Sequence, residues 1–497
     1  MVHRLMPVMT NFAKITLSLF LILLCLPLSR QGMFVDGVWY AAIAKNMAAG
    51  LGSVWDPALS KTMFLHFREH PSLAIAMQST FFHLFGDAFW VERLYCFLIA
   101  ICQIAVVYKL WANNLLSKKE RACTASFWWL LFLWLMIPIN IGMYKNNLLE
   151  ASLTLFSSLA CLALIRSFKS TRAFIGASIF SSICLILGFM CNGPSVLFPL
   201  AILFLYGWLI DRQSMQLLVM RTALLCMIAG FCFLLFFIAF PDALLNLKGY
   251  FHIQLMAAIT GQRDLSFTGW KHFYIVYIYL KDYIFLFLIG IGAIALQARL
   301  NQQSVFKHLK LAYKKPWFQF YFLLSLCASL PVGISHRQMF HYISASSPVI
   351  LLAIMHLTYP SLVAFKTYVK GRAATVASKN FSRILSVLLL ASVLGVISQF
   401  GGYNKNQQLI EEVKKVANFL PKEQVVKGSP QVMTNFDIPA NFARYSLVSF
   451  IALDTENAQL TSQYYIYYPG ESLLKGYEPV EMGLKFFHLA HMTRGKT

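Results

Sequence analysis

The amino-acid sequence predicts an all-α polytopic membrane protein with about 11 to 13 transmembrane helices, followed by a small C-terminal α/β domain. Three observations support this fold class. Of the 497 residues, 58% are hydrophobic and only 12% are charged, against roughly 25% charged residues in soluble proteins. Long apolar runs recur along the chain, each near the roughly 20 residues that cross a bilayer. Basic residues gather in alternate links between these runs. A water-soluble enzyme is therefore excluded.

The apolar runs define the expected helices in order. The first, at 12–28, follows Arg4 and Lys14 and lacks the small-residue cleavage site of a signal peptide, so we expect an uncleaved membrane helix. Ten further runs fit membrane helices: 89–108, 122–141, 147–165, 173–190, 194–210, 221–240, 282–298, 317–334, 338–358 and 384–400. One missed pair of short helices would raise the total from eleven to thirteen without changing the sidedness.

The basic residues predict the orientation. The longer polar links carry most of the Lys and Arg residues of this region, whereas the short links of the other side carry only Lys145 and Arg337. Because cytoplasmic links are enriched in Lys and Arg, we expect a cytoplasmic N-terminus and an outer C-terminus. The predicted division is a transmembrane domain over 1–400 and a soluble periplasmic domain over 401–497, in a multi-pass protein of a bacterial inner membrane.

Two long loops are expected on the outer side, at 31–88 and 241–281. Both contain apolar and aromatic stretches that are too short or too interrupted to span a bilayer, such as 73–77 and 81–85. Stretches of this kind suit helices that lie in the membrane interface.

Charge, cysteines and motifs exclude several classes of partner. The net charge of +22 would suggest nucleic acid in a soluble protein, but here the basic residues lie in links that orient the chain. The ten cysteines lie in or beside apolar stretches and form no C-x-x-C pair, so no metal site is expected. No P-loop, G-x-S-x-G, H-E-x-x-H or D-x-D motif occurs. We therefore expect no cofactor, and lipid-dependent transfer or secondary transport remains.

Two acids stand at the starts of expected outer helices. Asp36 follows the first membrane helix and would share a helix face with Tyr40. A carboxylate at the lipid boundary could act as general base on an acceptor hydroxyl while a lipid-linked donor approaches from the bilayer; the alternative is an N-cap. Glu150 begins a membrane helix shortly after Lys145, either as part of the same site or as a first-turn acid favoured by the helix dipole.

Cationic residues near these acids are candidates for binding an anion. Arg68, Glu69 and His70 precede Pro71, which suits the first turn of an interfacial helix. Arg68 or His70, with the N–H groups of that helix start, could hold a phosphate; otherwise Arg68 and Glu69 are solvated loop charges.

A second cationic stretch opens the tenth expected helix. Arg337, His341 and Tyr342 could line an anion site at the outer surface, although snorkelling also explains Arg337. Arg263 in the second long loop is a weaker candidate of the same kind.

Four motifs in 33–95 resemble the GT-C class of membrane glycosyltransferases, and most closely the protein mannosyltransferase and aminoarabinose transferase group (glycosyltransferase family 39-like). They are Asp36-Gly37 with Tyr40, Glu69-His70-Pro71-Ser72-Leu73, Phe85-Gly86-Asp87 and Glu92-Arg93-Leu94. The resemblance runs loosely from residue 12 to about 360. It implies a GT-C fold and a polyprenyl-phosphate sugar donor.

The resemblance also implies roles for individual residues. Asp36 takes the place of the first-loop catalytic acid, and Glu150 that of the second acid. Glu69 to Ser72 looks like the group's Glu-Lys-Pro-Pro segment, whose Lys contacts the lipid phosphate, with His70 in place of Lys. Because His is mostly neutral near pH 7, phosphate binding would pass to Arg68, Lys145 or Arg337. The stretch from Phe340 to Pro348 is similar to an Arg-Tyr-x-x-Pro helix, with His341 as the basic residue.

The expected function is an integral-membrane glycosyltransferase that moves a sugar from a polyprenyl-phosphate donor to a lipid, protein or glycan acceptor on the outer face, with inversion. Its expected partners are that donor, the acceptor and membrane lipids. The alternative is a transporter or lipid flippase without covalent chemistry. Transporters usually place polar residues in broken helices at mid-membrane, whereas here polar groups concentrate outside. A ligase-type relative that takes pyrophosphate-linked oligosaccharides is disfavoured by the few basic residues on that side.

Overall fold

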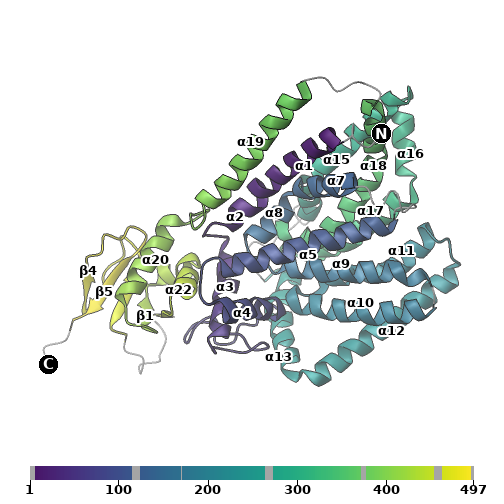
Figure 1. The fold of residues 1–497 in the computed structure, drawn as a ribbon. Coiled ribbons are helices and arrows are strands. Elements are labelled where there is room, and N and C mark those ends of the chain that lie inside the picture. Colours follow the sequence, from purple (N-terminus) through teal and green to yellow (C-terminus); the bar gives the residue numbers. More distant parts are fainter. Residues whose placement is uncertain are drawn as a thin grey trace.

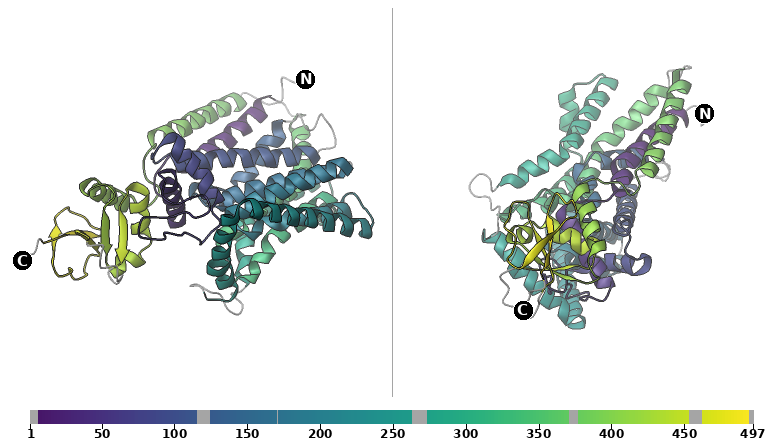
Figure 2. Two further views of the ribbon diagram at one scale, coloured as in Figure 1. Left: turned by 90° about the horizontal axis from the view of Figure 1, so that it is seen from below. Right: turned by 90° about the vertical axis from the view of Figure 1, so that its left-hand side faces the viewer.

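The structure, a computed structural model, describes residues 6–114, 124–169, 171–262, 273–370, 377–452 and 462–493. It consists of a large helical bundle with a small sheet-containing domain at one end of it (Figure 1). The left-hand view of Figure 2 shows the same separation, with the sheet at the far end of the molecule from most of the bundle helices.

The first part of the chain supplies one continuous long helix, made of α1, a π-helical turn and α2, and two shorter helices, α3 and α4. The bundle begins with α1 (Met6–Phe20), which continues through a π-helical turn at Leu21–Cys25 into α2 (Leu26–Leu28). The segment 31–88, expected to be a loop with interfacial helices, contains α3 (Val35–Ala48) and α4 (Leu73–Phe85). Helix α3 is buried on nearly all sides from Gly37 to Asn46, as expected for a helix without a polar face.

The rest of the bundle consists of long helices and shorter ones between them. They are α5 (Val91–Asn114), α7 (Thr124–Leu135), α8 (Pro138–Lys145), α9 (Glu150–Arg166), α10 (Thr171–Asn192), α11 (Ile202–Leu209), α12 (Met215–Ala239), α13 (Pro241–Tyr250), α14 (Ala257–Ile259), α15 (Tyr274–Leu300), α16 (Val305–Tyr313), α17 (Pro316–Ser329), α18 (Ser347–Lys370) and α19 (Ala377–Ser398). Three of them begin with proline, at Pro138, Pro241 and Pro316, because the first turn does not need the missing N–H group.

All eleven expected apolar runs lie on helices, but they are not all straight spans. Within the described residues, eight helices are long and apolar enough to cross a membrane, or nine if a bent pair is counted as one span. The run at 122–141 is this pair, α7 and α8, which meet at 73°. The run at 194–210 begins as a 3-10 helix at Pro194–Ala201 before α11. The protein is thus a multi-pass membrane protein with fewer full-length spans than runs.

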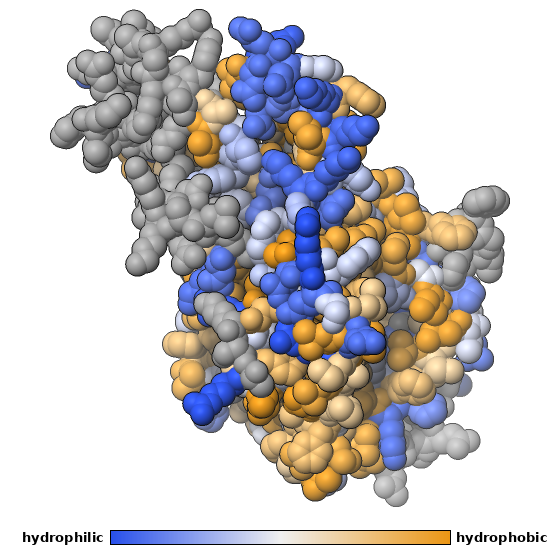
Figure 3. Space-filling model, turned by 90° about the vertical axis from the view of Figure 1, so that its right-hand side faces the viewer, coloured by the Kyte–Doolittle hydropathy of each residue, from blue (hydrophilic) through white to orange (hydrophobic). Residues whose placement is uncertain are grey.

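Several bundle helices present apolar side chains to the surroundings. In the apolar segments of α12 and α19 that are long enough to cross a membrane, only 11% of the residues are buried inside the protein. Exposed residues of α12 include Met220, Met227 and Ile238. Figure 3 shows broad apolar areas on one face of the molecule, alongside hydrophilic residues. Such surfaces are stable in contact with lipid chains.

Helix α19 leads the chain from the bundle to the C-terminal domain. It lies beside α1 (Figure 1), where Lys14 Nζ donates to Ser382 Oγ and Ser386 Oγ at 3.0 and 2.7 Å. After the C-terminal end of α19 the chain lies next to the segment that follows α2, where Gln31 N donates to the Gly402 carbonyl at 2.7 Å. The start of the C-terminal domain is therefore held next to the segment that leads into α3.

The C-terminal domain has α/β structure. Its elements are α20 (Gln407–Phe419), β1 (Val425–Gly428), α21 (Pro430–Thr434), α22 (Asp437–Tyr445), β2 (Ser449–Ala452), β3 (Tyr464–Tyr467), β4 (Tyr477–Val480) and β5 (His488–Met492). The strand order is β2-β1-β3-β5-β4. Strand β1 is parallel to β2 and β3, while β5 is antiparallel to β3 and β4.

Candidate functional site

A cavity of about 470 Å³ lies at the end of the bundle that faces the C-terminal domain. We call it the site cavity. Six parts of the chain line it: the start of α3, the segment before α4, the start of α9, the π-helical turn Phe251–Met256 between α13 and α14, the segment before α18 and the residue before α22. Its lining residues are Phe34, Val35, Asp36, Trp39, Tyr40, Phe64, Phe67, Glu69, His70, Leu148, Glu150, Gln254, Arg337, Met339, His341, Tyr342 and Phe436.

The starts of α3 and α9 are brought together by the turn between α8 and α9. Asn146 Oδ1 accepts from the backbone N–H of Phe34 at 3.0 Å, and Asn147 Nδ2 donates to the Gly37 carbonyl at 3.1 Å. Gly37 is required here, since a Cβ atom at this position would lie 1.8 Å from the Asn146 carbonyl oxygen. These contacts fix the first turn of α3 against the entry to α9.

The two expected acids consequently face the same cavity. Asp36 is half-buried in the first turn of α3, and Glu150 is buried in the first turn of α9. Glu150 Oε1 lies 3.6 Å from His341 Nε2, and both side chains are 8% exposed. A buried carboxylate is costly unless it is paired or protonated, and the distance to His341 is longer than a hydrogen bond.

Tyr40 lies among the acids. Burial raises its pKa well above the ordinary value, and the charges of Asp36 and Glu150 add to this shift, as do Tyr342 and Glu69. The Tyr40 hydroxyl therefore stays protonated at neutral pH and can donate a hydrogen bond inside the cavity.

The opposite wall carries the cationic candidates. Arg337 has its backbone fixed by Ser335, whose Oγ accepts from Arg337 N at 3.1 Å and donates to the Arg337 carbonyl at 2.7 Å. Among the described residues, Arg337 Nε has no hydrogen-bond partner. His70 lies edge-on to Tyr40 with ring centres 5.7 Å apart, and its Nδ1 is 3.2 Å from Asn192 Oδ1. An anion that entered the cavity would meet the Arg337 guanidinium.

Two of the expected substrate-binding residues, Arg68 and Lys145, do not line the site cavity. Arg68 turns away, with Nη2 3.3 Å from Asp56 Oδ1 and its methylene groups against Gly249 of α13. Lys145 is exposed at the end of α8. Each of these two charges already has a partner elsewhere: Asp56 for Arg68, and solvent for Lys145. Arg263, the third expected residue of this kind, lies outside the described residues. Glu69 does line the cavity, and its Oε2 accepts from Gln254 Nε2 at 3.0 Å.

The sequence did not reveal two supporting residues. Arg93 is 2% exposed, and it donates to the carbonyls of Lys145 at 2.5 Å and Gly32 at 2.9 Å. It thus ties the α8–α9 turn to the segment before α3. The motif Glu92-Arg93-Leu94 contributes to the family resemblance, but nothing in the sequence indicates that Arg93 has this structural role. Phe436 reaches the cavity from the C-terminal domain, roughly 400 residues after Asp36, and no local signal indicates it.

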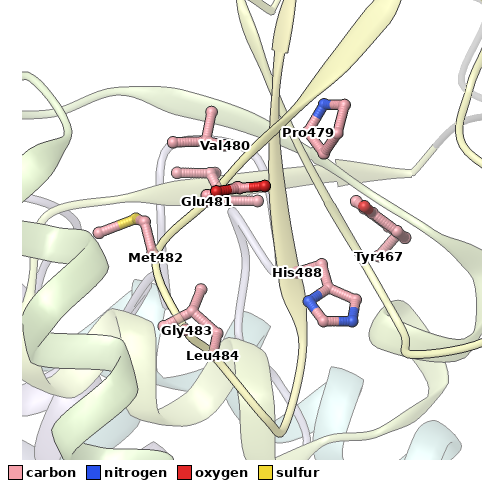
Figure 4. Close-up of a pocket in the computed structure, with 9 residues that line it drawn as sticks. Tyr467, Pro479, Val480, Glu481, Met482, Gly483, Leu484 and His488 are labelled. Carbon is pink, nitrogen blue, oxygen red and sulfur yellow. The ribbon is translucent and has the colours of Figure 1, made fainter.

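A second hollow lies on the C-terminal domain, away from these residues (Figure 4). It has a volume of about 410 Å³ and is lined by residues of β4, β5 and the connection between them, with Tyr467 of β3. None of the expected site residues lines it. No group of three or more His, Cys, Asp or Glu residues in the described part of the chain could hold a metal ion. The site cavity is therefore the candidate active site.

Two solved structures of one protein share this fold, and a third structure matches less closely. The crystal structure of ArnT from Cupriavidus metallidurans bound to undecaprenyl phosphate matches with a TM-score of 0.62 and 14% identity, over 97% of this chain and 98% of that chain. The apo form matches with a TM-score of 0.60 and 14% identity, over 96% of each chain. The oligosaccharyltransferase AglB from Archaeoglobus fulgidus matches with a TM-score of 0.47 and 11% identity, over 88% of this chain and 66% of that chain.

No protein-family model and no curated protein matches the sequence. The likeness to ArnT extends over nearly the whole length of both chains. The expected fold class is thus confirmed: the protein has a GT-C fold with a small C-terminal α/β domain.

Proposed function

We propose that this protein is an integral-membrane glycosyltransferase that moves a sugar from a polyprenyl-phosphate donor to an acceptor hydroxyl on the outer face of the membrane. The observation that carries the proposal is the site cavity, where Asp36 and Glu150 face Arg337 and two histidines at the end of an apolar bundle. The fold adds support, since ArnT, which shares it, has been solved with undecaprenyl phosphate bound.

A groove beside the site cavity suits the chain of such a donor. It has a volume of about 400 Å³, lies between α15 and α17, and is lined by Ile275, Val276, Tyr279, Leu280, Phe287, Phe322, Leu326, Ser329 and Leu330. Ile275 N donates to Gln338 Oε1 at 2.5 Å, so one end of the groove adjoins the residue after Arg337. A prenyl chain in the groove would leave its phosphate near the Arg337 guanidinium, which binds phosphate through charge-assisted hydrogen bonds.

In the proposed reaction Asp36 is the general base. It takes the proton of the acceptor hydroxyl while that oxygen attacks the anomeric carbon from the face opposite the phosphate. The bond between the anomeric carbon and the phosphate oxygen breaks, the polyprenyl phosphate leaves with the bonding electrons, and the configuration inverts. Arg337 stabilises the charge on the leaving phosphate. Glu150 is the second acid, and it lies 3.6 Å from His341 in the same cavity.

The proposal includes an orientation. The N-terminus lies in the cytoplasm, and residues 401–497 form a periplasmic domain of an inner-membrane protein. This orientation places the site cavity on the side where the acceptor and the sugar part of the donor meet, while the basic links lie in the cytoplasm.

The test is sugar transfer by the purified protein in liposomes that contain a polyprenyl-phosphate sugar. Asp36→Asn keeps the shape of the side chain and removes the base, so transfer is expected to fall by about 10²- to 10⁴-fold. Asp242→Asn is the matched control, because Asp242 is an exposed acid in the first turn of α13 that does not line the cavity. A folded Asp36→Asn protein with full transfer would refute the base. A wild type that moves the lipid across the bilayer without transfer would identify a flippase.

A further inference from the structure

We propose that the C-terminal domain forms part of the acceptor site, and that Phe436 with Trp39 and Phe64 binds the ring of a saccharide acceptor. These three residues are called the aromatic platform. The inference rests on the proposed function and names the acceptor class that the function leaves open. All three residues line the site cavity, and each comes from a different part of the chain.

The rings of the platform are arranged around Trp39. Its ring centre lies 5.2 Å from that of Phe64 at an interplanar angle of 82°, and 6.1 Å from that of Phe436 at 64°. Trp39 is 8% exposed, whereas Phe64 and Phe436 are 37% and 56% exposed. The two phenylalanines therefore lie at the rim of the cavity with uncovered ring surface, which costs free energy in water unless a ligand covers it.

The backbone at Phe64 supports a functional reading of this position. Its φ angle is +47°, in the left-handed region that bulky residues rarely adopt. Strained backbone of this kind persists where the surroundings hold it, often at ligand sites. Here the Phe64 carbonyl accepts from Leu59 N at 3.1 Å. Glycine would relieve the strain, but it would also remove the ring.

Phe436 is held in place because it directly precedes α22, a helix anchored at its other end. Arg444 is 1% exposed and donates from Nε and Nη2 to the two oxygens of Glu92, at 3.2 and 2.8 Å. Its Nη1 lies 2.6 Å from Asp87 Oδ1. Lys45 at the end of α3 donates to the carbonyls of Arg444 and Ser446, at 3.1 and 2.7 Å. Helix α22 thus runs alongside α3.

Packing between α3 and α22 fixes the same register. Ala440 and Ala443 belong to the core of the bundle together with Ala41 and Ala44 of α3, while Phe442 belongs to the core of the C-terminal domain. Small side chains allow the two helices to approach closely. Because α3 also carries Asp36, the aromatic platform and the proposed base are parts of one rigid arrangement.

The chemistry of this arrangement fits a pyranose. One face of a pyranose ring presents C–H groups that pack on aromatic rings, while its hydroxyls need polar partners. With the C–H face on Phe64 and Phe436, a hydroxyl can point towards Asp36 and Tyr40. Apolar walls with a few convergent polar groups are typical of small-molecule sites. A hydroxyl on a peptide side chain would leave most of the platform uncovered.

The experiment measures acceptor binding and transfer separately in the full-length protein. The acceptor is a mixture of methyl pyranosides of common hexoses and hexosamines, and the comparison is a Ser/Thr peptide. For Phe436→Ala we expect the KM of the pyranoside to rise about tenfold, with kcat and the KM of the donor within about twofold. Phe436→Trp should restore the KM. Phe419→Ala is the control, because Phe419 is also exposed in the C-terminal domain but does not line the site cavity.

Calorimetric titration of the pyranosides, without a donor, separates the two proposals. If the pyranosides bind in a Phe436-dependent way but no sugar is transferred, the transferase proposal fails and the platform stands. If transfer occurs with an unchanged pyranoside KM in Phe436→Ala, the platform is refuted while the transferase stands. Transfer to the peptide alone would refute the saccharide as acceptor class.

Discussion

At the scale of single residues, the site cavity combines two acids, each at the start of a helix, with one arginine. Asp36, Glu150 and Arg337 come from segments more than 100 residues apart in sequence, yet they line one cavity. Of these groups, Arg337 is the one with a buried nitrogen, Nε, that has no hydrogen-bond partner in the described part of the protein. A buried donor without a partner is costly, and a phosphate bound in the cavity would supply the acceptor that Arg337 Nε lacks.

Substitution of Arg337 should consequently affect the donor. For Arg337→Gln we expect the KM of the polyprenyl-phosphate sugar to rise by about 10- to 100-fold, the range given by the roughly 1.5–3 kcal/mol of a hydrogen bond to a charged group. Arg337→Lys should recover part of the loss, since it keeps the charge but not the planar fork. Donor titration in liposomes gives the KM. Lys145→Gln serves as the control and should remain within about twofold, and equal effects of both changes would contradict the assignment.

The candidate residues themselves could largely be predicted, but their positions could not. Asp36 and Glu150 are recognisable because acids are rare at the ends of apolar runs. Their meeting depends on two hydrogen bonds at the start of α3: Asn146 accepts from Phe34 N, and Asn147 donates to the Gly37 carbonyl. The spacing of residues in the sequence does not reveal these contacts. Arg68 was predicted from its place next to His70, but its pairing with Asp56 turns it aside.

At the scale of elements, hydrophobicity predicted helices well and their geometry less well. Every expected run is helical because the backbone must satisfy its own hydrogen bonds in lipid. The bend of 73° between α7 and α8 was not predicted, although Pro138 marks it in the sequence. The bend places the end of α8 and the α8–α9 turn beside α3. A helix that places Asp36 and Tyr40 on one face was expected from the sequence, but the burial of α3 on nearly all sides was not.

Burial of α3 also predicts an unusual dependence of stability on pH. Burial lowers the pKa of Lys45 from 10.5 to about 8, partly opposed by Asp87. Between these values the unfolded chain holds a proton that the folded protein lacks, so stability rises with pH over this range; the penalty is fully present below pH 8. In Lys45→Met this rise should disappear, which melting temperatures at pH 7.5, 8.5 and 9.5 would measure. Lys475→Met, at an exposed site, should keep the wild-type slope, and a slope that survives in Lys45→Met would contradict the prediction.

At the scale of the whole molecule, the C-terminal domain is built into the bundle through α22. This helix contributes Ala440 and Ala443 to one core and Ile438 and Phe442 to the other. A small α/β domain after residue 400 could be predicted from composition, because the apolar runs end there. Its docking could not, since the ion pair of Glu92 and Arg444 joins residues that are 352 positions apart in the sequence, and nothing at either residue indicates the other.

The last prediction concerns the contact between Glu92 and Arg444, which docks α22 on the bundle. Glu92 and Arg444 are each 1% exposed, whereas the Asp87 side chain is 48% exposed. Arg444→Met therefore leaves Glu92 buried without its cation, which should destabilise the protein by about 3–5 kcal/mol, while Asp87 can be rehydrated. Hydrogen exchange should increase along α22 and α3, and the pyranoside KM should rise as in Phe436→Ala.

The double variant Glu92→Met/Arg444→Met distinguishes the buried charge from the docking itself. With both charges removed, apolar side chains fill the space, and most of the lost melting temperature should return. If the pyranoside KM returns as well, packing of α22 on α3 alone positions Phe436. If stability returns but the KM stays high, the Arg444 hydrogen bonds set the angle at which α22 presents the ring. A single Arg444→Met variant with wild-type melting temperature and exchange would show that the pair does not hold the domain.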